Sequence, residues 1–143
     1  MKPLLSGEVL IEVPFHDVDS MGVAWHGHYV KYLELARTAM MRKVGLDWQQ
    51  MQDWGVMWPV VVCNLKFIRP LRYGQKVRVR ADLVEYQARL RITYLLTDAA
   101  TGERVNKAET IQLAVAFGTG ELLFECPPML TEAITKGDGL TNA

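Results

Sequence analysis

The sequence predicts an α+β fold in which a curved antiparallel β-sheet wraps around one long central helix. The segment from residue 28 to residue 44 carries apolar side chains on nearly all sides, which is typical of a helix enclosed by other structure. Four later segments alternate apolar and polar residues and are joined by short connections, which favours an antiparallel meander. A sheet that curls around the helix would bury the apolar side chains of both the helix and the strands.

Each element has its own signal in the sequence. A first strand is expected over residues 8–15, where apolar residues alternate loosely. The long helix is expected to begin at residue 28 or 29 and to stop before Gly45, and a shorter helix or helical turn follows over residues 46–54. The four strands of the meander are expected at residues 60–68, 76–86, 90–96 and 111–117.

The chain has 143 residues, and we expect one domain over residues 1–126. Beyond Cys126 the period is lost, so residues 127–143 are predicted to form a flexible C-terminal tail. Sixteen Lys and Arg balance sixteen Asp and Glu, and this neutrality argues against nucleic acid as a general partner. A small molecule or a protein is the expected partner.

The compartment is predicted from what the sequence lacks. The first residues do not resemble a signal peptide, and no apolar run approaches the roughly 20 residues that span a bilayer. We therefore expect a cytoplasmic protein without membrane insertion. In a reducing compartment Cys63 and Cys126 are expected to be buried thiols.

Ionisable residues cluster in the loop before the long helix. Asp17 and Asp19 could be turn or capping residues, or they could belong to a site that nearby glycines open to a ligand. All three histidines of the chain, His16, His26 and His28, also lie there, and these are metal-binding residue types. Their spacing fits no familiar metal motif, so we expect no metal.

The run D-V-D-S-M-G-V-A-W-H-G-H-Y-V-K-Y-L-E-L-A-R, from Asp17 to Arg37, resembles the signature of the hotdog-fold acyl-CoA thioesterases, in particular the 4-hydroxybenzoyl-CoA thioesterase and YbgC group. The segment from Pro59 to Gln75 resembles the second strand of that family and its following turn. With the order of the elements, the likeness covers residues 8 to about 118. It implies the hotdog fold.

The resemblance also implies roles for single residues. Asp19 matches the catalytic aspartate, which attacks the thioester carbonyl or activates the attacking water. His26 matches the position whose backbone N–H polarises that carbonyl at the helix start, and its imidazole can assist. Asp17 matches a structural partner in the site. Phe15 departs from the pattern, because YbgC-like members carry a supporting tyrosine there.

Further residues are expected to bind the substrate. Gly27 lets the backbone approach a ligand, while Trp25 and Tyr29 supply an apolar wall. Two arginines at the start of the strand predicted over residues 90–96 fall near the place where relatives bind the phosphates of coenzyme A; the alternative is that they are solvated charges on the strand face. An asparagine in the strand over residues 60–68 could hydrogen-bond near the site. The two arginines are Arg89 and Arg91, and the asparagine is Asn64.

The resemblance implies hydrolysis of an acyl- or aroyl-CoA thioester, or of an acyl-carrier-protein thioester, with no cofactor. The alternative is a non-catalytic acyl-binding or assembly module that keeps the fold. A dehydratase of the same fold is disfavoured because its His-centred pattern is absent. A sheet that wraps one helix leaves an open edge, so we expect a homodimer, or a homotetramer. The resemblance implies that the site is shared across the dimer interface.

Overall fold

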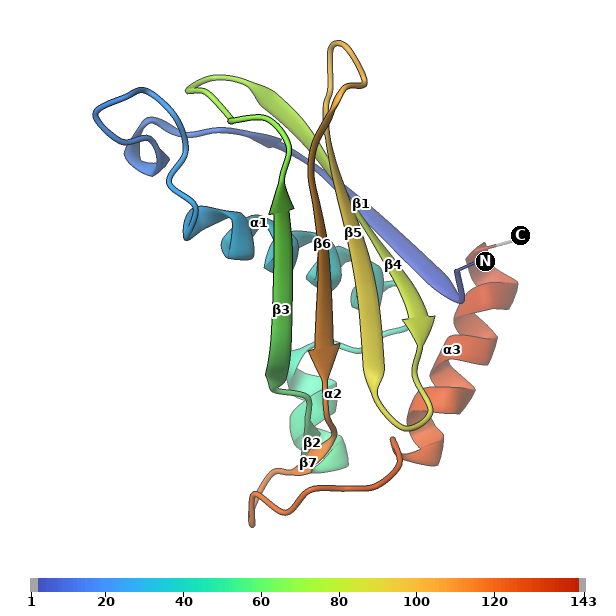
Figure 1. The fold of residues 1–143 in the computed structure, drawn as a ribbon. Coiled ribbons are helices and arrows are strands. Elements are labelled where there is room, and N and C mark those ends of the chain that lie inside the picture. The colour runs from blue at the N-terminus through green and yellow to red at the C-terminus, as the bar shows by residue number, and fades with distance from the viewer. Residues whose placement is uncertain (1–2, 142–143) are drawn as a thin grey trace.

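The computed structural model describes residues 3–141, and the side chains of residues 3–135. Its main feature is a five-stranded antiparallel sheet with the strand order β1-β4-β5-β6-β3 (Figure 1). A two-stranded sheet, β2-β7, lies apart from it. The strands are β1 (Leu5–Glu12), β2 (Val56–Met57), β3 (Val60–Phe67), β4 (Lys76–Glu85), β5 (Leu90–Asp98), β6 (Arg104–Gln112) and β7 (Val115–Ala116).

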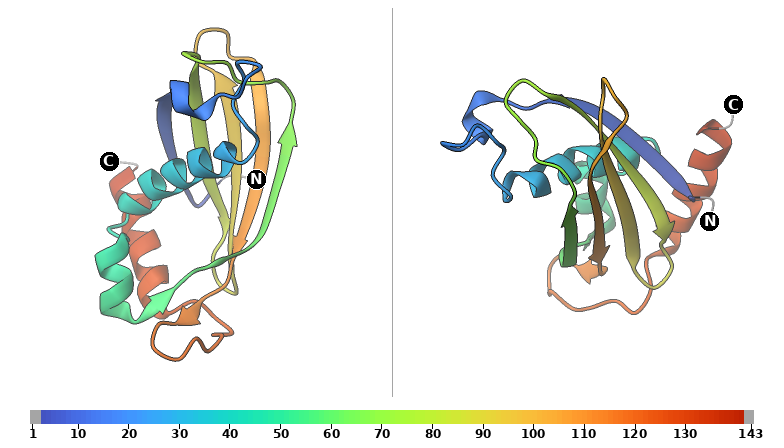
Figure 2. Two further views of the ribbon diagram at one scale, coloured as in Figure 1. Left: turned by 90° about the vertical axis from the view of Figure 1, so that its left-hand side faces the viewer. Right: turned by 45° about the horizontal axis from the view of Figure 1, so that its top comes forward.

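Three helices lie on one side of the sheet (Figure 2). They are α1 (His28–Arg42), α2 (Trp48–Trp54) and α3 (Pro128–Thr141). Helix α1 packs on β1 and β4, and Gly7 lets the β1 backbone lie directly on it: a Cβ at Gly7 would sit 2.5 Å from the backbone of Met40. The predicted layout, a curved sheet around one long helix, is therefore present.

Strands β4 and β5 form the centre of the core. Their inward residues alternate strictly, as the sequence predicts, because both strands have a neighbour on each side and a helix layer on one face. The inward residues, Val77, Val79, Ala81, Leu83, Leu90, Ile92, Tyr94 and Leu96, are all buried.

The predicted four-strand meander is only partly correct. Strands β4, β5 and β6 do follow one another, but β3 pairs with β6 rather than with β4. The connection from Ile68 to Gln75 therefore crosses the end of the sheet to reach β4. Strand β3 then lies at the sheet edge, and β1 occupies the opposite edge.

The last long strand is also different from the prediction. It runs over Arg104–Gln112, and only the short β7 lies within the expected 111–117. The sequence obscured this strand because its inward face is polar: Asn106, Thr110 and Gln112 are buried there. Thr110 shares a hydrogen bond with Tyr94, whereas both polar atoms of the Asn106 side chain are buried without a partner in the described part of the chain.

One side of the protein is left open along β3 and α1. The apolar residues Val61, Cys63 and Phe67 of β3 are exposed although they alternate as the sequence predicts for an inward face. On α1, Leu35 is 49% exposed, so the helix is not wrapped on all sides as expected. Both observations place an uncovered apolar surface beside the unpaired edge of β3.

The segment after residue 126 differs from the expected tail. Residues Pro128–Thr141 form helix α3, which contacts β1. Leu130 and Ile134 of this helix are buried in the core.

Among the residues of the described range, no helix is long and apolar enough to cross a membrane.

Candidate active site

A buried carboxylate anchors the loop that joins β1 to α1. Asp17 ends a short 3₁₀ helix, η1 (Phe15–Asp17), and its side chain is fully shielded from solvent. Its two oxygens accept hydrogen bonds from Lys31 Nζ at 2.7 and 2.8 Å, and Oδ2 also accepts one from the Tyr32 hydroxyl at 2.6 Å. Both donors stand on the first turns of α1. The Asp17 side chain thus fastens the loop to the helix.

The surroundings of Asp17 favour its charged form. Burial by itself raises the pKa of the carboxyl, but the hydrogen bonds from Lys31 and Tyr32 and the Lys31 charge together lower the pKa below its ordinary value. Tyr32 responds in the opposite direction, because burial and the adjacent carboxylate raise its pKa. Asp17 is therefore an ionised anchor and not a proton donor.

Asp19 lies two residues further on, in an exposed turn. Its Oδ1 accepts hydrogen bonds from the backbone N–H groups of Met21 at 2.8 Å and Val23 at 3.4 Å. Gly22 completes the turn with a φ of 77°, a conformation that suits glycine. Asp19 Oδ2 makes no hydrogen bond within the described residues, so one carboxylate oxygen holds the turn and the other is free to act.

His26 stands just before α1. Its backbone N–H has no hydrogen-bond partner in the described part of the chain, whereas His28 N–H donates to Trp25 and Tyr29 N–H donates to His26. A free N–H at the positive end of a helix is suited to bind a carbonyl oxygen that gains negative charge. The His26 imidazole packs on Phe67 of β3, with ring centroids 4.6 Å apart.

A cavity of about 290 Å³ opens beside this helix start. We call it the His26 cavity. His26, Tyr29 and Phe67 supply its aromatic surface, and Phe67 meets the Tyr29 ring edge-on at 4.9 Å between centroids. The remaining lining comes from the loop before the helix and from the connection after β3, namely Val23, Ala24, Ile68, Arg69 and Pro70.

Trp25 and Gly27 lie just before the first residue of α1. The Trp25 indole lies over Gly27 so closely that a Cβ there would approach the ring to 2.1 Å. Trp25 also meets the His28 ring edge-on, and its backbone N–H donates to the carbonyl oxygen of Asp17 at 3.1 Å. A side chain at position 27 would therefore displace the indole. Trp25 itself remains largely exposed.

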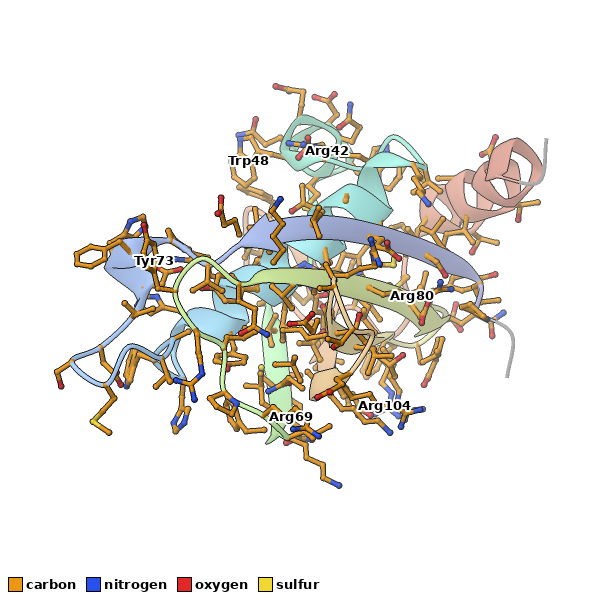
Figure 3. All side chains as sticks on the ribbon, turned by 90° about the horizontal axis from the view of Figure 1, so that it is seen from above. Arg42, Trp48, Arg69, Tyr73, Arg80 and Arg104 are labelled. Atoms are coloured by element: carbon orange, nitrogen blue, oxygen red, sulfur yellow. The ribbon has the colours of Figure 1, made fainter. Side chains whose placement is uncertain are left out.

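Phe15, where the resemblance implies a tyrosine, packs edge-on against Tyr73, with ring centroids 5.6 Å apart. Figure 3 shows Tyr73 against the loop that follows β1. The Tyr73 phenol therefore lies beside position 15, where phenylalanine carries no hydroxyl. His16 is exposed, and its Nε2 lies 3.6 Å from Asp17 Oδ1.

Three predicted binding residues lie away from the His26 cavity in this protomer. Asn64 is three residues from Phe67, so strand alternation places it on the outer face, where it is paired in register with Glu109. Arg89 and Arg91 lie at the far end of the sheet and form ion pairs with Glu85 and Glu109. Their roles in substrate binding remain predictions.

Sequence reasoning missed the two groups that hold Asp17. Lys31 follows Asp17 by fourteen residues and has the spacing of an ordinary polar helix face, and Tyr32 has the spacing of a core residue. Phe67 was assigned to a strand face without its contact to His26.

Across residues 3–135, no group of three or more His, Cys, Asp or Glu side chains is arranged to hold a metal ion.

A family model described as the thioesterase-like superfamily matches residues 13–134. The chain belongs to this superfamily. It is also 30% identical over 130 residues to a Synechocystis protein provisionally named an esterase, a match that covers 90% of this chain and 78% of that protein. The 1,4-dihydroxy-2-naphthoyl-CoA hydrolase of Thermosynechococcus vestitus is 28% identical over 100 residues, which is 68% of each chain.

Solved structures of thioesterases share the fold of this superfamily member. The DHNA-CoA thioesterase of Staphylococcus aureus matches with a TM-score of 0.82 and 26% identity, covering 96% of this chain and 93% of that one. The predicted membership of the hotdog thioesterases, and the predicted hotdog fold, are confirmed.

The ionised state of Asp17 leads to a prediction for stability. Because its folded pKa lies below the unfolded value of about 3.9, the unfolded state binds more protons at acid pH. The stabilising contribution is therefore complete above the unfolded pKa and is lost as pH falls through the folded pKa. Asp17→Asn should lower the free energy of unfolding at pH 7 by about 1.5–3 kcal/mol, the range for hydrogen bonds to a charged group.

The measurement is urea unfolding of wild type and Asp17→Asn between pH 7 and pH 2.5. The difference between the two proteins should shrink as pH falls below about 4, because the Asp17 carboxyl takes up a proton first in the unfolded chain and, at lower pH, in the folded protein. Asp53→Asn, a change at an exposed carboxylate on α2, is the control and should show a small difference throughout. A wild-type advantage over Asp17→Asn that does not change with pH would show that the charge of Asp17 has no role.

Proposed function

We propose that this protein hydrolyses acyl- or aroyl-CoA thioesters to a free acid and a thiol. The observation that carries the proposal is the unpartnered backbone N–H of His26, which stands at a helix start beside a cavity and follows the Asp19 turn. Membership of the thioesterase-like superfamily supports the same reaction. Relatives named for hydrolysis of 1,4-dihydroxy-2-naphthoyl-CoA make CoA the favoured thiol carrier over acyl-carrier protein.

The proposed mechanism begins with the thioester carbonyl oxygen accepting a hydrogen bond from His26 N–H. The helix start stabilises the negative charge that develops on this oxygen. Asp19 then acts in one of two ways. As a nucleophile it attacks the carbonyl carbon, the thiolate leaves, and water hydrolyses the resulting anhydride. As a general base it takes a proton from the water that attacks directly.

The unpaired Oδ2 of Asp19 is the atom that suits either role, since Oδ1 is occupied by the turn. The reaction as proposed draws only on protein groups and on the CoA of the substrate, with no further cofactor. A cytoplasmic location also remains a proposal, and the free thiols of Cys63 and Cys126 are compatible with it.

We further propose that the protein works as a homodimer formed through β3. The strand is an unpaired sheet edge with exposed apolar residues, including Val60, Val61 and Val62. Such an edge readily pairs with a second copy of itself. Antiparallel pairing of two β3 strands would cover the apolar side of α1 and bring the start of one β3 near the end of the other. A tetramer would join two such dimers through the outer sheet face.

The first test replaces Asp19. Asp19→Asn keeps the size of the side chain but removes the charge, so turnover of CoA thioesters should fall by about 10²–10⁴-fold. The measurement is thiol release from a panel of aliphatic and aromatic acyl-CoA substrates, with Asp53→Asn as the control. Unchanged turnover in Asp19→Asn would remove the mechanism. Binding without turnover by folded wild type would favour the alternative, a non-catalytic acyl-binding module.

The second test concerns the β3 edge. Sedimentation of wild type at micromolar concentration should show a dimer or tetramer. The double variant Val60→Lys, Val62→Lys places charges on this edge and should yield monomers with greatly reduced turnover. Leu10→Lys, on the exposed part of the opposite edge strand β1, is the matched control and should leave the assembly intact. A monomeric wild type would contradict the shared site.

A further inference from the structure

A second cavity, of about 220 Å³, lies at the other end of α1 between that helix, α2 and the sheet. We call it the α1–β6 cavity. Its apolar lining includes Met41, Met51, Met57 and Leu90. Methionine side chains are flexible and polarisable, so they can adapt to ligands of irregular shape. An apolar cavity of about 150 Å³ is known to hold benzene, and this one has room for a ring with a substituent.

Two polar side chains, Arg37 and Gln112, interrupt this apolar lining. Gln112 is only 4% exposed, and its Nε2 donates to the carbonyl oxygen of Trp58 at 2.5 Å. That bond fixes the orientation of the amide, because the reverse orientation would set two acceptors against each other. Gln112 Oε1 is then left buried without a partner among the described residues.

Arg37 presents the complementary group. Its Nη2 donates to Glu34, one turn earlier on α1, while Nη1 is buried and has no partner in the described part of the chain. An unsatisfied buried donor or acceptor costs about 1–3 kcal/mol, so two such groups in the lining of one cavity need a reason. Arg37 Nη1 is a hydrogen-bond donor, and Gln112 Oε1 is an acceptor.

A hydroxyl group placed between the two atoms would satisfy both, because its oxygen accepts a hydrogen bond while its proton is donated. A carboxylate would accept from Arg37 but repel Gln112 Oε1, and Glu34 already balances the charge of Arg37. An ammonium group would donate to Gln112 Oε1 but could not accept a hydrogen bond from Arg37 Nη1. A methyl group would leave both atoms unpaired. The chemistry of the cavity therefore selects a neutral hydroxyl.

The position of the cavity connects it to the proposed reaction. Arg37 lies eleven residues after His26, about 16 Å along the helix, which separates the two cavities within one protomer. Pro59, at the start of β3, lines the α1–β6 cavity, whereas Phe67, at the end of β3, lines the His26 cavity. Antiparallel pairing of two β3 strands would bring the α1–β6 cavity of one copy toward the His26 cavity of the other.

We propose that the α1–β6 cavity binds the far end of the acyl group, and that Arg37 and Gln112 select acyl groups that carry a hydroxyl there. This inference rests on the proposed thioesterase function and adds a substrate class to it. Hydrolysis itself does not require the hydroxyl. The two residues set specificity and take no part in the bond-breaking step.

The experiment compares matched pairs of substrates with and without the hydroxyl: 4-hydroxybenzoyl-CoA with benzoyl-CoA, and 6-hydroxyhexanoyl-CoA with hexanoyl-CoA. Wild type should prefer the hydroxylated member of at least one pair by about tenfold or more in kcat/KM, because rejection leaves buried polar groups unpaired. Gln112→Leu should bring the ratio close to one, mainly by lowering kcat/KM for the hydroxylated substrate.

Arg37→Lys is a second variant, which keeps the charge beside Glu34 but removes the second guanidinium nitrogen, and it should also reduce the ratio. Thr110→Val changes another buried polar residue on the same face of β6, outside the cavity lining, and should leave the ratio unchanged. Calorimetric binding of the same substrate pairs gives an independent ratio if a variant is too unstable for kinetics.

Equal kcat/KM and equal binding within both pairs for wild type would overturn the inference and show that the cavity holds water only. Turnover of all four substrates without preference would leave the thioesterase function standing while the inference fails. Absence of any turnover would remove the thioesterase function instead, and the binding ratio would then decide whether the cavity recognises a hydroxyl.

Discussion

The buried carboxylate of Asp17 fixes the geometry on which the candidate site depends. Its side chain is held by Lys31 and Tyr32 of α1, and its backbone carbonyl accepts the N–H of Trp25. The same residue therefore joins the start of the loop, the end of the loop and the helix. Asp19 is two residues away on one side of this junction, and His26 follows Trp25 on the other. Firm placement of Asp17 therefore constrains both Asp19, the proposed reactive carboxylate, and the backbone N–H of His26.

The open edge at β3 is the second constraint. A central sheet strand would have neighbours on both sides, but β3 has only β6, and its apolar residues are largely exposed. The two cavities lie at opposite ends of this strand. A single protomer thus holds the helix start that we propose binds the carbonyl and, at a distance, the apolar α1–β6 cavity that we propose binds the acyl group. The proposed pairing of two copies would bring the two cavities together.

The sequence predicts best where burial follows a regular period. Helix α1 and strands β4 and β5 match their apolar patterns because helix and sheet bury each other. Strand β6 was misplaced since Asn106, Thr110 and Gln112 give its inward face a polar composition. The pairing of β3 with β6 depends on contacts between distant segments, which local periodicity does not record.

Helix α3 was hidden for a different reason: prolines precede it and glycines interrupt its later part, so its composition suggests a tail. In the site, Asp19 and His26 could be named because their spacing matches a family signature. The contacts of Asp17 with Lys31 and Tyr32 could not, since they arise only when the loop folds back on the helix. The unpaired atoms of Arg37 and Gln112 likewise belong to two elements that meet only in the folded protein.

The most direct test is the crystal structure of Asp19→Asn with a bound acyl-CoA, in which slow turnover preserves the thioester. The carbonyl oxygen should lie about 2.7–3.1 Å from the backbone nitrogen of His26, with the side chain at position 19 facing the carbonyl carbon. The acyl group should extend toward the second copy. A thioester bound away from the start of α1 would contradict the assignment of this loop and helix start as the active site.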